Sequence, residues 1–226
     1  MKAMILAAGR GDRLRPLTEH TPKPLLQIGD ESLLERHLRR LSAAGFNDVV
    51  INVSHLGEVI EHTIGDGRSF GVIVEYSREP DGPLETAGGI RHALTQLGSE
   101  PFLVVNGDIW TDFEFADATQ LSAPTVVLVP NPAHNESGDF DCEQNLAVRH
   151  GGSHRYTYAG IGVFDPGIFA ALASAPMPLG PLLFELAAAG QLGARVHAGH
   201  WFDIGTPERL QQVREFTRKL ARKPAN

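Results

Sequence analysis

Short apolar segments alternate with amphipathic segments along the first half of the chain. Residues 4–7, 49–53 and 102–105 are apolar runs of strand length, and residues 31–44 carry leucines at helical spacing before Gly45. Because strands and helices alternate, the strands should form a mostly parallel sheet with helices on both faces. The sequence therefore predicts a Rossmann-like, three-layer α/β sandwich with a mixed, mostly parallel sheet, which binds ligands beyond the carboxyl ends of its strands.

The other elements are predicted from the same two patterns, apolar runs of strand length and apolar residues at helical spacing. Helices are expected at residues 55–64, 86–97, 166–173, 180–189 and 207 to about 222, and strands at 72–76, 125–129, 145–149, 156–164 and 194–198. Residues 130–141 are polar and rich in turn formers. Since no repeat or low-complexity segment interrupts the pattern, we expect a single domain over residues 1–226.

Charge and cysteine content exclude several classes of protein. The 226 residues carry a net charge of −7, so a basic cluster near the N-terminus is local, and nucleic acid is not an expected partner. The single cysteine, Cys142, excludes an internal disulfide and fits a reducing compartment. Arg10 ends the first apolar run, and no longer one could span a membrane. We expect a cytoplasmic protein without membrane contact; the oligomeric state stays open.

Glycine and cationic residues gather directly after the first predicted strand. Residues 6–14 read LAAGRGDRL, residues 15–18 read RPLT and residues 22–25 read PKPL. The glycines let backbone N–H groups approach a ligand, and three arginines and a lysine add fixed positive charge. The spacing fits neither the dinucleotide fingerprint nor the Walker pattern. The segment therefore predicts a polyphosphate site of another kind.

This segment resembles the signature of the sugar-nucleotide pyrophosphorylases, L-A-A-G-x-G-x-R-L-x-P-L-T followed by P-K-P-L, and matches every fixed position. The resemblance implies the nucleotide-diphospho-sugar transferase fold, with a nucleoside triphosphate and a sugar 1-phosphate as substrates. It implies that Arg13 stabilises the departing pyrophosphate and that Lys23 contacts the phosphates at the reacting centre. Each could instead be a solvated surface charge. Base and phosphates should contact the backbone at Leu6, Ala7, Ala8, Gly9 and Gly11.

The resemblance also implies that the two halves of the chain bind different parts of the substrates. The nucleotide should bind to about residues 1–110 and the sugar to about residues 111–226. Many larger members end in an isoleucine-rich hexapeptide array, and this sequence contains no such array. We therefore expect no second, hexapeptide-repeat domain.

Two aspartates follow apolar segments of strand type. Asp108 ends the segment VVNGD and Asp203 lies in WFDIGT. Either could cap a turn or a helix, but carboxylates beside phosphate oxygens are typical of Mg²⁺ sites. The family uses the aspartate of each motif as a metal ligand, so the resemblance implies that both bind Mg²⁺. His197 and His200 share a metal-like spacing with Asp203, but residues three apart in a strand face opposite ways, so zinc is not expected.

Residues 83–90, PLETAGGI, form a turn that opens into a predicted helix. Backbone N–H groups at such a turn can contact a nucleotide, and we expect the base to contact Glu85, Thr86 and Gly88. Many relatives have glycine in place of Glu85. The pattern L-E-T-x-G-G is similar to the branch that makes UDP-N-acetylmuramic acid from UTP and N-acetylmuramic acid 1-phosphate in peptidoglycan recycling. Glu85 could instead be an ordinary first-turn carboxylate favoured by the helix dipole.

Sugar contacts are expected in the second half of the chain and at the end of the central strand. The positions that match the family's sugar contacts are Asn106, Asp139, Tyr158 and Gly160. Many relatives hold the sugar phosphate with a second lysine, but no lysine lies between Lys23 and Lys219. Arg149, Arg155 or Arg195 could replace it, or Lys23 and the metal could suffice.

Other functions of the same fold remain open at this point. One is a mannose- or heptose-1-phosphate guanylyltransferase, or another hexose-1-phosphate nucleotidyltransferase. Another is a nucleotide-sugar sensor without catalytic activity. Retention of Lys23, Asp108 and Asp203 argues against a sensor, which would not need all three.

Overall fold

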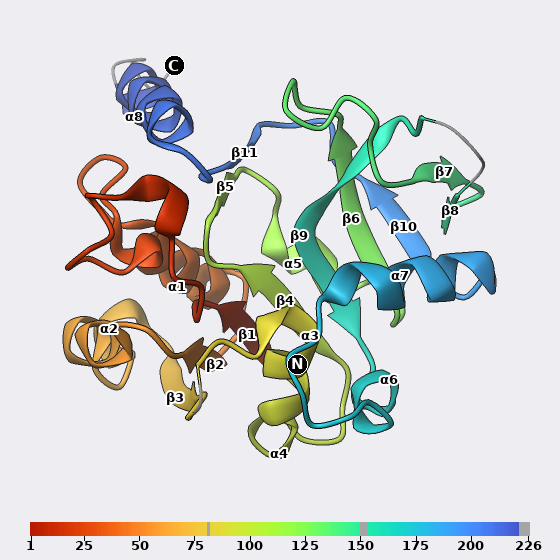
Figure 1. Cartoon of the computed structure of the whole chain (residues 1–226), viewed down its shortest axis with the longest axis horizontal. Helices are drawn as coiled ribbons and strands as arrows, with labels where there is room; N and C mark the ends of the chain where they lie inside the picture. Colours follow the sequence, from red (N-terminus) through yellow and green to blue (C-terminus); the bar gives the residue numbers. More distant parts are fainter. Residues whose placement is uncertain (81, 150–152, 222–226) are drawn as a thin grey trace.

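A nine-stranded sheet runs through the part of the chain that this computed structural model describes, residues 1–80, 82–149 and 153–221 (Figure 1). Its order is β3-β2-β1-β4-β9-β6-β10-β8-β7. The strands are β1 (Ala3–Leu6), β2 (Asp48–Val53), β3 (Ile73–Arg78), β4 (Phe102–Asn106), β6 (Thr125–Pro130), β7 (Asp141–Glu143), β8 (Leu146–Val148), β9 (Tyr156–Phe164) and β10 (Gly193–Val196). Only β8 and β9 run against the common direction of these strands, which confirms the mostly parallel sheet.

Helices cover both faces of this sheet. They are α1 (Leu33–Ala43), α2 (Gly57–Ile64), α3 (Glu85–His92), α4 (Leu94–Leu97), α5 (Phe115–Ala118), α6 (Pro166–Ala170), α7 (Leu179–Ala188) and α8 (Pro207–Ala221), with short 3₁₀ helices η1 (Asp12–Leu14), η2 (Lys23–Leu25) and η3 (Arg68–Phe70). Successive strand residues point to opposite faces. Ile5 packs with α1 and α2, whereas Met4 packs with α3 and α7. Two cores therefore flank the sheet, as the predicted sandwich requires.

Helix α1 has both a capped N-terminus and an apolar face. The Ser32 hydroxyl accepts a hydrogen bond from the Glu35 amide, and the Glu35 carboxylate accepts one from the Ser32 amide. This capping box satisfies two amides that the helix leaves unpaired. Leu34, Leu38 and Leu41 are buried against the sheet. The helix therefore begins two residues after its predicted start and ends one residue before its predicted end.

His37, on the same helix, should make the protein sensitive to acid. Burial, with Arg36 and Arg40 nearby, lowers the pKa of His37 to about 3, although the charge of Asp108 opposes the shift. In the unfolded chain this histidine keeps its ordinary pKa of about 6.5 and binds a proton more readily than in the folded protein. Below pH 6.5 the free energy of unfolding therefore decreases by about 1.4 kcal/mol for each unit by which the pH is lowered. The free energy of unfolding should be lower at pH 5 than at pH 7, and His37→Leu should remove about 2 kcal/mol of this difference.

Urea unfolding at the two pH values measures this difference. His62, exposed on α2, provides the control His62→Leu, which should keep the acid dependence of the unchanged protein. An equal acid dependence in His37→Leu and the unchanged protein would contradict the role given to His37.

Several elements differ from the sequence predictions. The helix expected at residues 86–97 is two helices, α3 and α4, that meet at Ala93. The helix expected at residues 166–173 ends at Ala170. The predicted end of the last helix, Arg222, lies outside the described residues. Strands β5 (Ile109–Thr111), β7 and β11 (Trp201–Asp203) were not expected, because three residues are too few to show a period.

The last helix returns to the N-terminal part of the molecule (Figure 1). Leu210 and Val213 of α8 pack in a third core with Leu14 and Trp110. The Arg214 guanidinium also donates to the carbonyl of Gln27 at 2.9 Å. Helix α8 thus lies beside the glycine- and arginine-rich segment. Among the described residues, no helix is both long enough and apolar enough to cross a membrane.

Candidate active site

The glycine- and arginine-rich segment forms one wall of a cavity of about 560 Å³ at the carboxyl end of β1. Gly11 turns the chain here with φ +68°, and its carbonyl accepts bonds from the Leu14 amide at 2.9 Å and the Thr18 hydroxyl at 2.8 Å. A Cβ on Gly11 would lie 3.0 Å from the Thr18 methyl group. Both the positive φ and this close contact therefore favour glycine here. The lining residues are Leu6–Leu14, Lys23, Pro24, Asn52, Pro83, Glu85, Thr86, Asn106, Asp108 and Gly205.

Lys23 and Asp108 meet in this cavity. Helix η2 carries Lys23 between Pro22 and Pro24, and Asp108 follows β4, the strand beside β1. The Lys23 ammonium group donates to the Asp108 carboxylate. Their side chains are 12% and 34% exposed, so this ion pair is partly shielded from water. The sequence prediction placed both residues at the site, and the structure brings them into contact.

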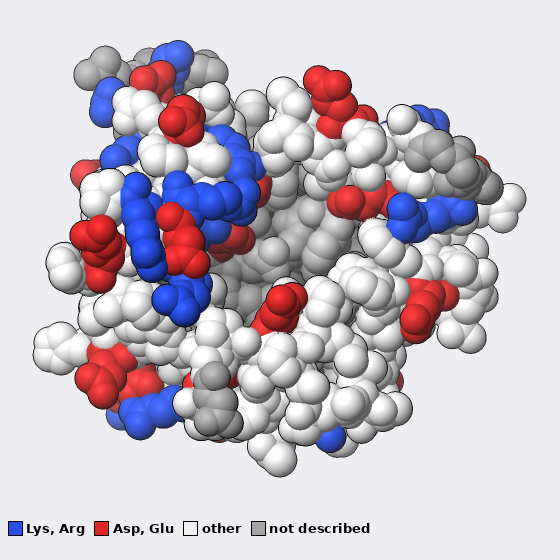
Figure 2. All heavy atoms as spheres, in the orientation of Figure 1, with Lys and Arg blue, Asp and Glu red and all other residues white. Residues whose placement is uncertain are grey.

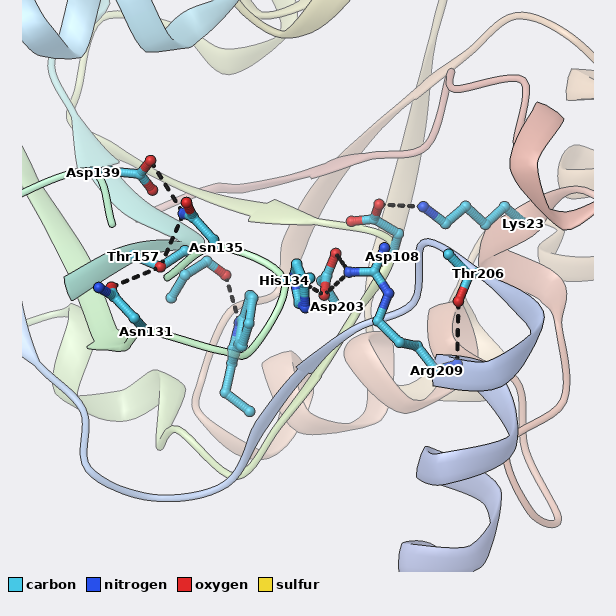
Figure 3. A network of polar contacts seen from close by, with 12 residues as sticks. Lys23, Asp108, Asn131, His134, Asn135, Asp139, Thr157, Asp203, Thr206 and Arg209 are labelled. Atoms are coloured by element: carbon cyan, nitrogen blue, oxygen red, sulfur yellow. Dashed lines mark hydrogen bonds and ion pairs between the residues drawn. The ribbon is translucent and has the colours of Figure 1, made fainter. Parts of the chain in front are cut away.

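Asp203 lies beside Asp108 because β5 and β11 form a two-stranded antiparallel sheet. Asp203 pairs with Ile109 in this sheet, and the Ile204 amide donates to the Asp108 carbonyl at 2.8 Å. The Asp203 carboxylate accepts from the Arg209 guanidinium and contacts His134 Nε2 at 2.9 Å (Figure 3). The two predicted metal ligands thus occupy neighbouring strand ends, each paired with cationic or imidazole groups.

Arg209 is a site residue that the sequence analysis missed. It stands in the first turn of α8, and its guanidinium reaches back to Asp203. A Cβ on Gly205 would lie 2.3 Å from Nη2 of Arg209 and 3.2 Å from Nη2 of Arg13. Glycine at this position therefore leaves room for two guanidinium groups. The only sequence signal was position, since Arg209 follows the WFDIGT motif by three residues.

A chain of buried hydrogen bonds connects the two sides of the cavity. Asn52 accepts a hydrogen bond from the Ala7 amide at 2.8 Å and donates to Glu79 at 2.8 Å. Glu79 in turn accepts from the Leu84 amide at 2.7 Å. Asn52 and Glu79 are 3% and 5% exposed, so these hydrogen bonds are shielded from water and strong. They fix the first loop relative to the segment that carries Glu85.

Glu85 has an unusual backbone. Its φ of +58° lies in the left-handed region, which favours glycine and costs an ordinary residue on the order of 1 kcal/mol. The residue is exposed and lines the cavity together with Thr86. Gly88 does not line it: a Cβ there would lie 2.6 Å from the carbonyl oxygen of Ala175, in the segment before α7. The structure thus brings two of the three predicted base contacts to the cavity.

The predicted sugar contacts have different surroundings. Asn106 lines the cavity and packs on Gly160, whose φ is +73°. The Asp139 carboxylate accepts from the Tyr158 amide at 2.9 Å and from Asn135 at 3.3 Å, which fixes the loop that carries His134 (Figure 3). Burial raises the pKa of the Tyr158 hydroxyl, which has no hydrogen-bond partner among the described residues. Of these four residues, only Asn106 lines the cavity.

Positive charge gathers on one side of the central hollow (Figure 2). The cavity lining includes Arg10, Arg13 and Lys23, but none of the three arginines considered as replacements for the missing lysine. Of those, Arg155 pairs with Asp141 at 2.9 Å, and this hydrogen bond holds the pKa of Asp141 below its usual range. Arg149 stacks on an aromatic ring of α7 at 3.6 Å. The cations that line the cavity are therefore Arg10, Arg13 and Lys23, all from the glycine- and arginine-rich segment and η2.

The histidines do not form a transition-metal site within the described part of the chain. His197 is bonded to Asp112 at 2.8 Å, and His200 stacks on Phe216 with ring centroids 4.6 Å apart. No three His, Cys, Asp or Glu side chains gather in metal-binding geometry among these residues. Of the two predicted metal ligands, Asp108 lines the cavity, and Asp203 lies just outside its lining, on the adjoining strand β11.

Comparisons with known proteins show which family the chain belongs to. Residues 2–219 match the family model for nucleotidyl transferases. The chain is 46% identical to N-acetylmuramate alpha-1-phosphate uridylyltransferase of Neisseria meningitidis serogroup B, over 94% of this chain and 96% of that protein. It is 31% identical to the mannose-1-phosphate guanylyltransferase catalytic subunit beta of Drosophila melanogaster, over 92% of this chain and 60% of that protein.

A solved structure shows the same fold. A glucose-1-phosphate thymidylyltransferase from Bacillus anthracis aligns with a TM-score of 0.85 over 96% of this chain and 95% of that one, at 21% identity. This confirms the predicted nucleotide-diphospho-sugar transferase fold. Together with the family match and the signature in residues 6–25, it leads to one conclusion: the chain belongs to the nucleotidyl transferase family.

Proposed function

We propose that this protein joins UTP to N-acetylmuramic acid 1-phosphate, giving UDP-N-acetylmuramic acid and pyrophosphate, as a step of peptidoglycan recycling. The observation that carries the proposal is that the glycine- and arginine-rich segment, Lys23, Asp108 and Glu85 line the same cavity. The substrate pair is supported by the 46% identical relative, whose name specifies this reaction. The length of the aligned region, nearly all of both chains, supports the same activity.

Catalysis rests on positioning and charge. An oxygen of the sugar phosphate attacks the α-phosphorus of the triphosphate in line with the departing pyrophosphate. Arg13 and Arg209, whose guanidiniums approach the same glycine, would stabilise the pyrophosphate, while Lys23 would contact the phosphates at the reacting centre. Backbone amides of residues 7–11 would bind the other phosphate oxygens. No covalent intermediate is required.

Mg²⁺ fits the two carboxylates at the cavity edge. It prefers oxygen ligands and keeps several waters, so it is commonly bound by one or two carboxylates together with substrate phosphates. Asp108, which directly precedes β5, and Asp203, at the end of β11, supply such a pair. To bind the ion, the Asp108 carboxylate would break its ion pair with Lys23, and the Asp203 carboxylate would break its ion pair with Arg209. When bound, Mg²⁺ neutralises charge on the phosphate oxygens.

A matrix of nucleoside triphosphates against sugar 1-phosphates tests the substrate assignment. Pyrophosphate release should be fastest with UTP and N-acetylmuramic acid 1-phosphate. Faster release with GTP and mannose 1-phosphate would overturn the substrates but keep the reaction, and the 31% identical guanylyltransferase is the reason to include that pair. No release with any pair would leave a nucleotide-sugar sensor.

Glu85→Gly should weaken the preference for UTP over GTP. The side chain of Glu85 narrows the base end of the cavity, where many relatives have glycine, so its removal admits a larger purine. We expect the ratio of kcat/KM for UTP to that for GTP to fall about tenfold, or about 1.4 kcal/mol. The fold should tolerate the change, since glycine relieves the positive φ at this position. An unchanged ratio at an unchanged melting temperature would remove Glu85 from base selection.

A further inference from the structure

A second cavity, of about 790 Å³, lies between α8, α1 and the segment of residues 27–31. It shares no lining residue with the active-site cavity. Its volume falls within the range of about 300–1,000 Å³ typical of sites for small molecules. The cavity is therefore large enough to bind a small molecule separately from the substrates.

Guanidinium groups dominate the charge of this second cavity. Arg36 and Arg39 line it from α1, and Arg214 and Arg218 line it from α8, against the two carboxylates Asp30 and Glu31. The carboxylates leave an excess of two positive charges in a chain whose net charge is −7. This local excess would attract an anion.

Most of these guanidinium groups have free hydrogen-bonding capacity. Glu31 is shared between Arg36 and Arg39, and each ion pair is 3.5 Å long. Arg214 uses its Nε on the Gln27 carbonyl. Arg218 makes no ion pair or hydrogen bond within the described part of the chain. Guanidinium groups bind phosphate oxygens through paired N–H donors, so the lining is suited to phosphate.

The remaining lining of the second cavity is mixed: Gln27 and Thr217 are polar, and the other residues offer apolar surface. Ile28 and Leu220 contribute aliphatic surface, and Leu220 is 43% exposed. Trp110 forms part of the wall, with the guanidinium of Arg36 4.6 Å from the centre of its ring. The buried indole N–H of Trp110 has no acceptor among the described residues. We propose that this cavity binds a phosphorylated small molecule with an apolar or flat organic body, such as a nucleoside monophosphate.

AMP titrated into ¹⁵N-labelled protein tests this proposal through the indole N–H signals. The chain has two tryptophans, and Trp201→Phe assigns the signal of Trp110 by elimination. AMP should shift the Trp110 signal with a saturable dependence on concentration. Adenosine, which lacks the phosphate, should not shift it. The readout is binding, so it does not depend on the reaction proposed for the first cavity.

Variants of α8 locate the binding. Arg214→Ala/Arg218→Ala should weaken AMP binding on the order of tenfold or more, because two charge-assisted contacts are lost. Lys219→Ala is the matched control, since Lys219 is an exposed cation of the same helix that does not line the cavity, and its affinity should stay within about twofold. A Trp110 signal that does not shift at millimolar AMP, or equal weakening in both variants, would overturn the proposal.

Discussion

Lys23→Ala is expected to lower kcat by about 10²–10³-fold, the effect of removing one charged donor from a reacting centre. Lys23 is largely shielded from water, so its charge would act strongly on a bound phosphate once Asp108 turns from the lysine to the metal. The fold should survive, since Asp108 is 34% exposed and water can solvate the carboxylate that loses its partner. Pyrophosphate release under saturating substrates measures the loss, and the melting temperature checks the fold.

Two further variants sharpen this test. Lys219→Ala removes an exposed lysine of α8 and should leave kcat unchanged. Lys23→Arg keeps the charge but replaces a compact ammonium with a planar, wider group, so only partial activity is expected. Near-normal turnover of Lys23→Ala with an unchanged melting temperature would remove Lys23 from the reacting centre.

The elements that sequence predicted well are those with long, local patterns. Helix α1 shows its apolar face, its capping residues and its terminal glycine within fourteen residues, and the predicted bounds differ from the observed ones by one or two. Strands β2, β4 and β9 are mostly apolar and five to nine residues long. In each of these the information that fixes the element lies inside the element itself.

The parts that sequence missed depend on partners far along the chain. Strand β9 lies between β4 and β6 and runs against both, an order that no local period encodes. The hairpin of β7 and β8 turns at Gln144 and Asn145, both with positive φ, without the glycine that normally signals such a turn. These features become visible only when the register of the whole sheet is known.

The same distinction applies to the site. The signature in residues 6–25 placed Arg13 and Lys23 at the cavity, and both line it. Arg209, Asn52 and Glu79 have no signature, since an arginine in a first turn or an asparagine in a strand is ordinary by itself. They lie at the site because β11 pairs with β5, β2 lies beside β1, and β3 lies beside β2. Sequence therefore identified the groups proposed to touch phosphate but not those that position them.

Asp108→Asn should raise the Mg²⁺ concentration needed for half-maximal activity by at least about tenfold and lower kcat/KM by about 10²–10³-fold. The amide has the size of the carboxylate but no charge, so the fold and the Ile204 contact to the backbone carbonyl should remain. Loss of the carboxylate charge also frees Lys23 from its ion pair, so Asp108 would no longer compete with the substrate phosphate for the lysine. The defect should therefore lie mainly in metal dependence, measured by Mg²⁺ titration of pyrophosphate release.

Asp112→Asn is the matched control for this variant. Asp112 directly follows β5, is bonded to His197 and does not line the active-site cavity, so its Mg²⁺ dependence should equal that of the unchanged protein. Asp203→Asn should resemble Asp108→Asn, and the double variant should lose little more than either single one, since one ion would need both carboxylates. If the half-maximal Mg²⁺ concentration is unchanged in Asp108→Asn, the paired carboxylates serve Lys23 and Arg209 and do not bind the metal.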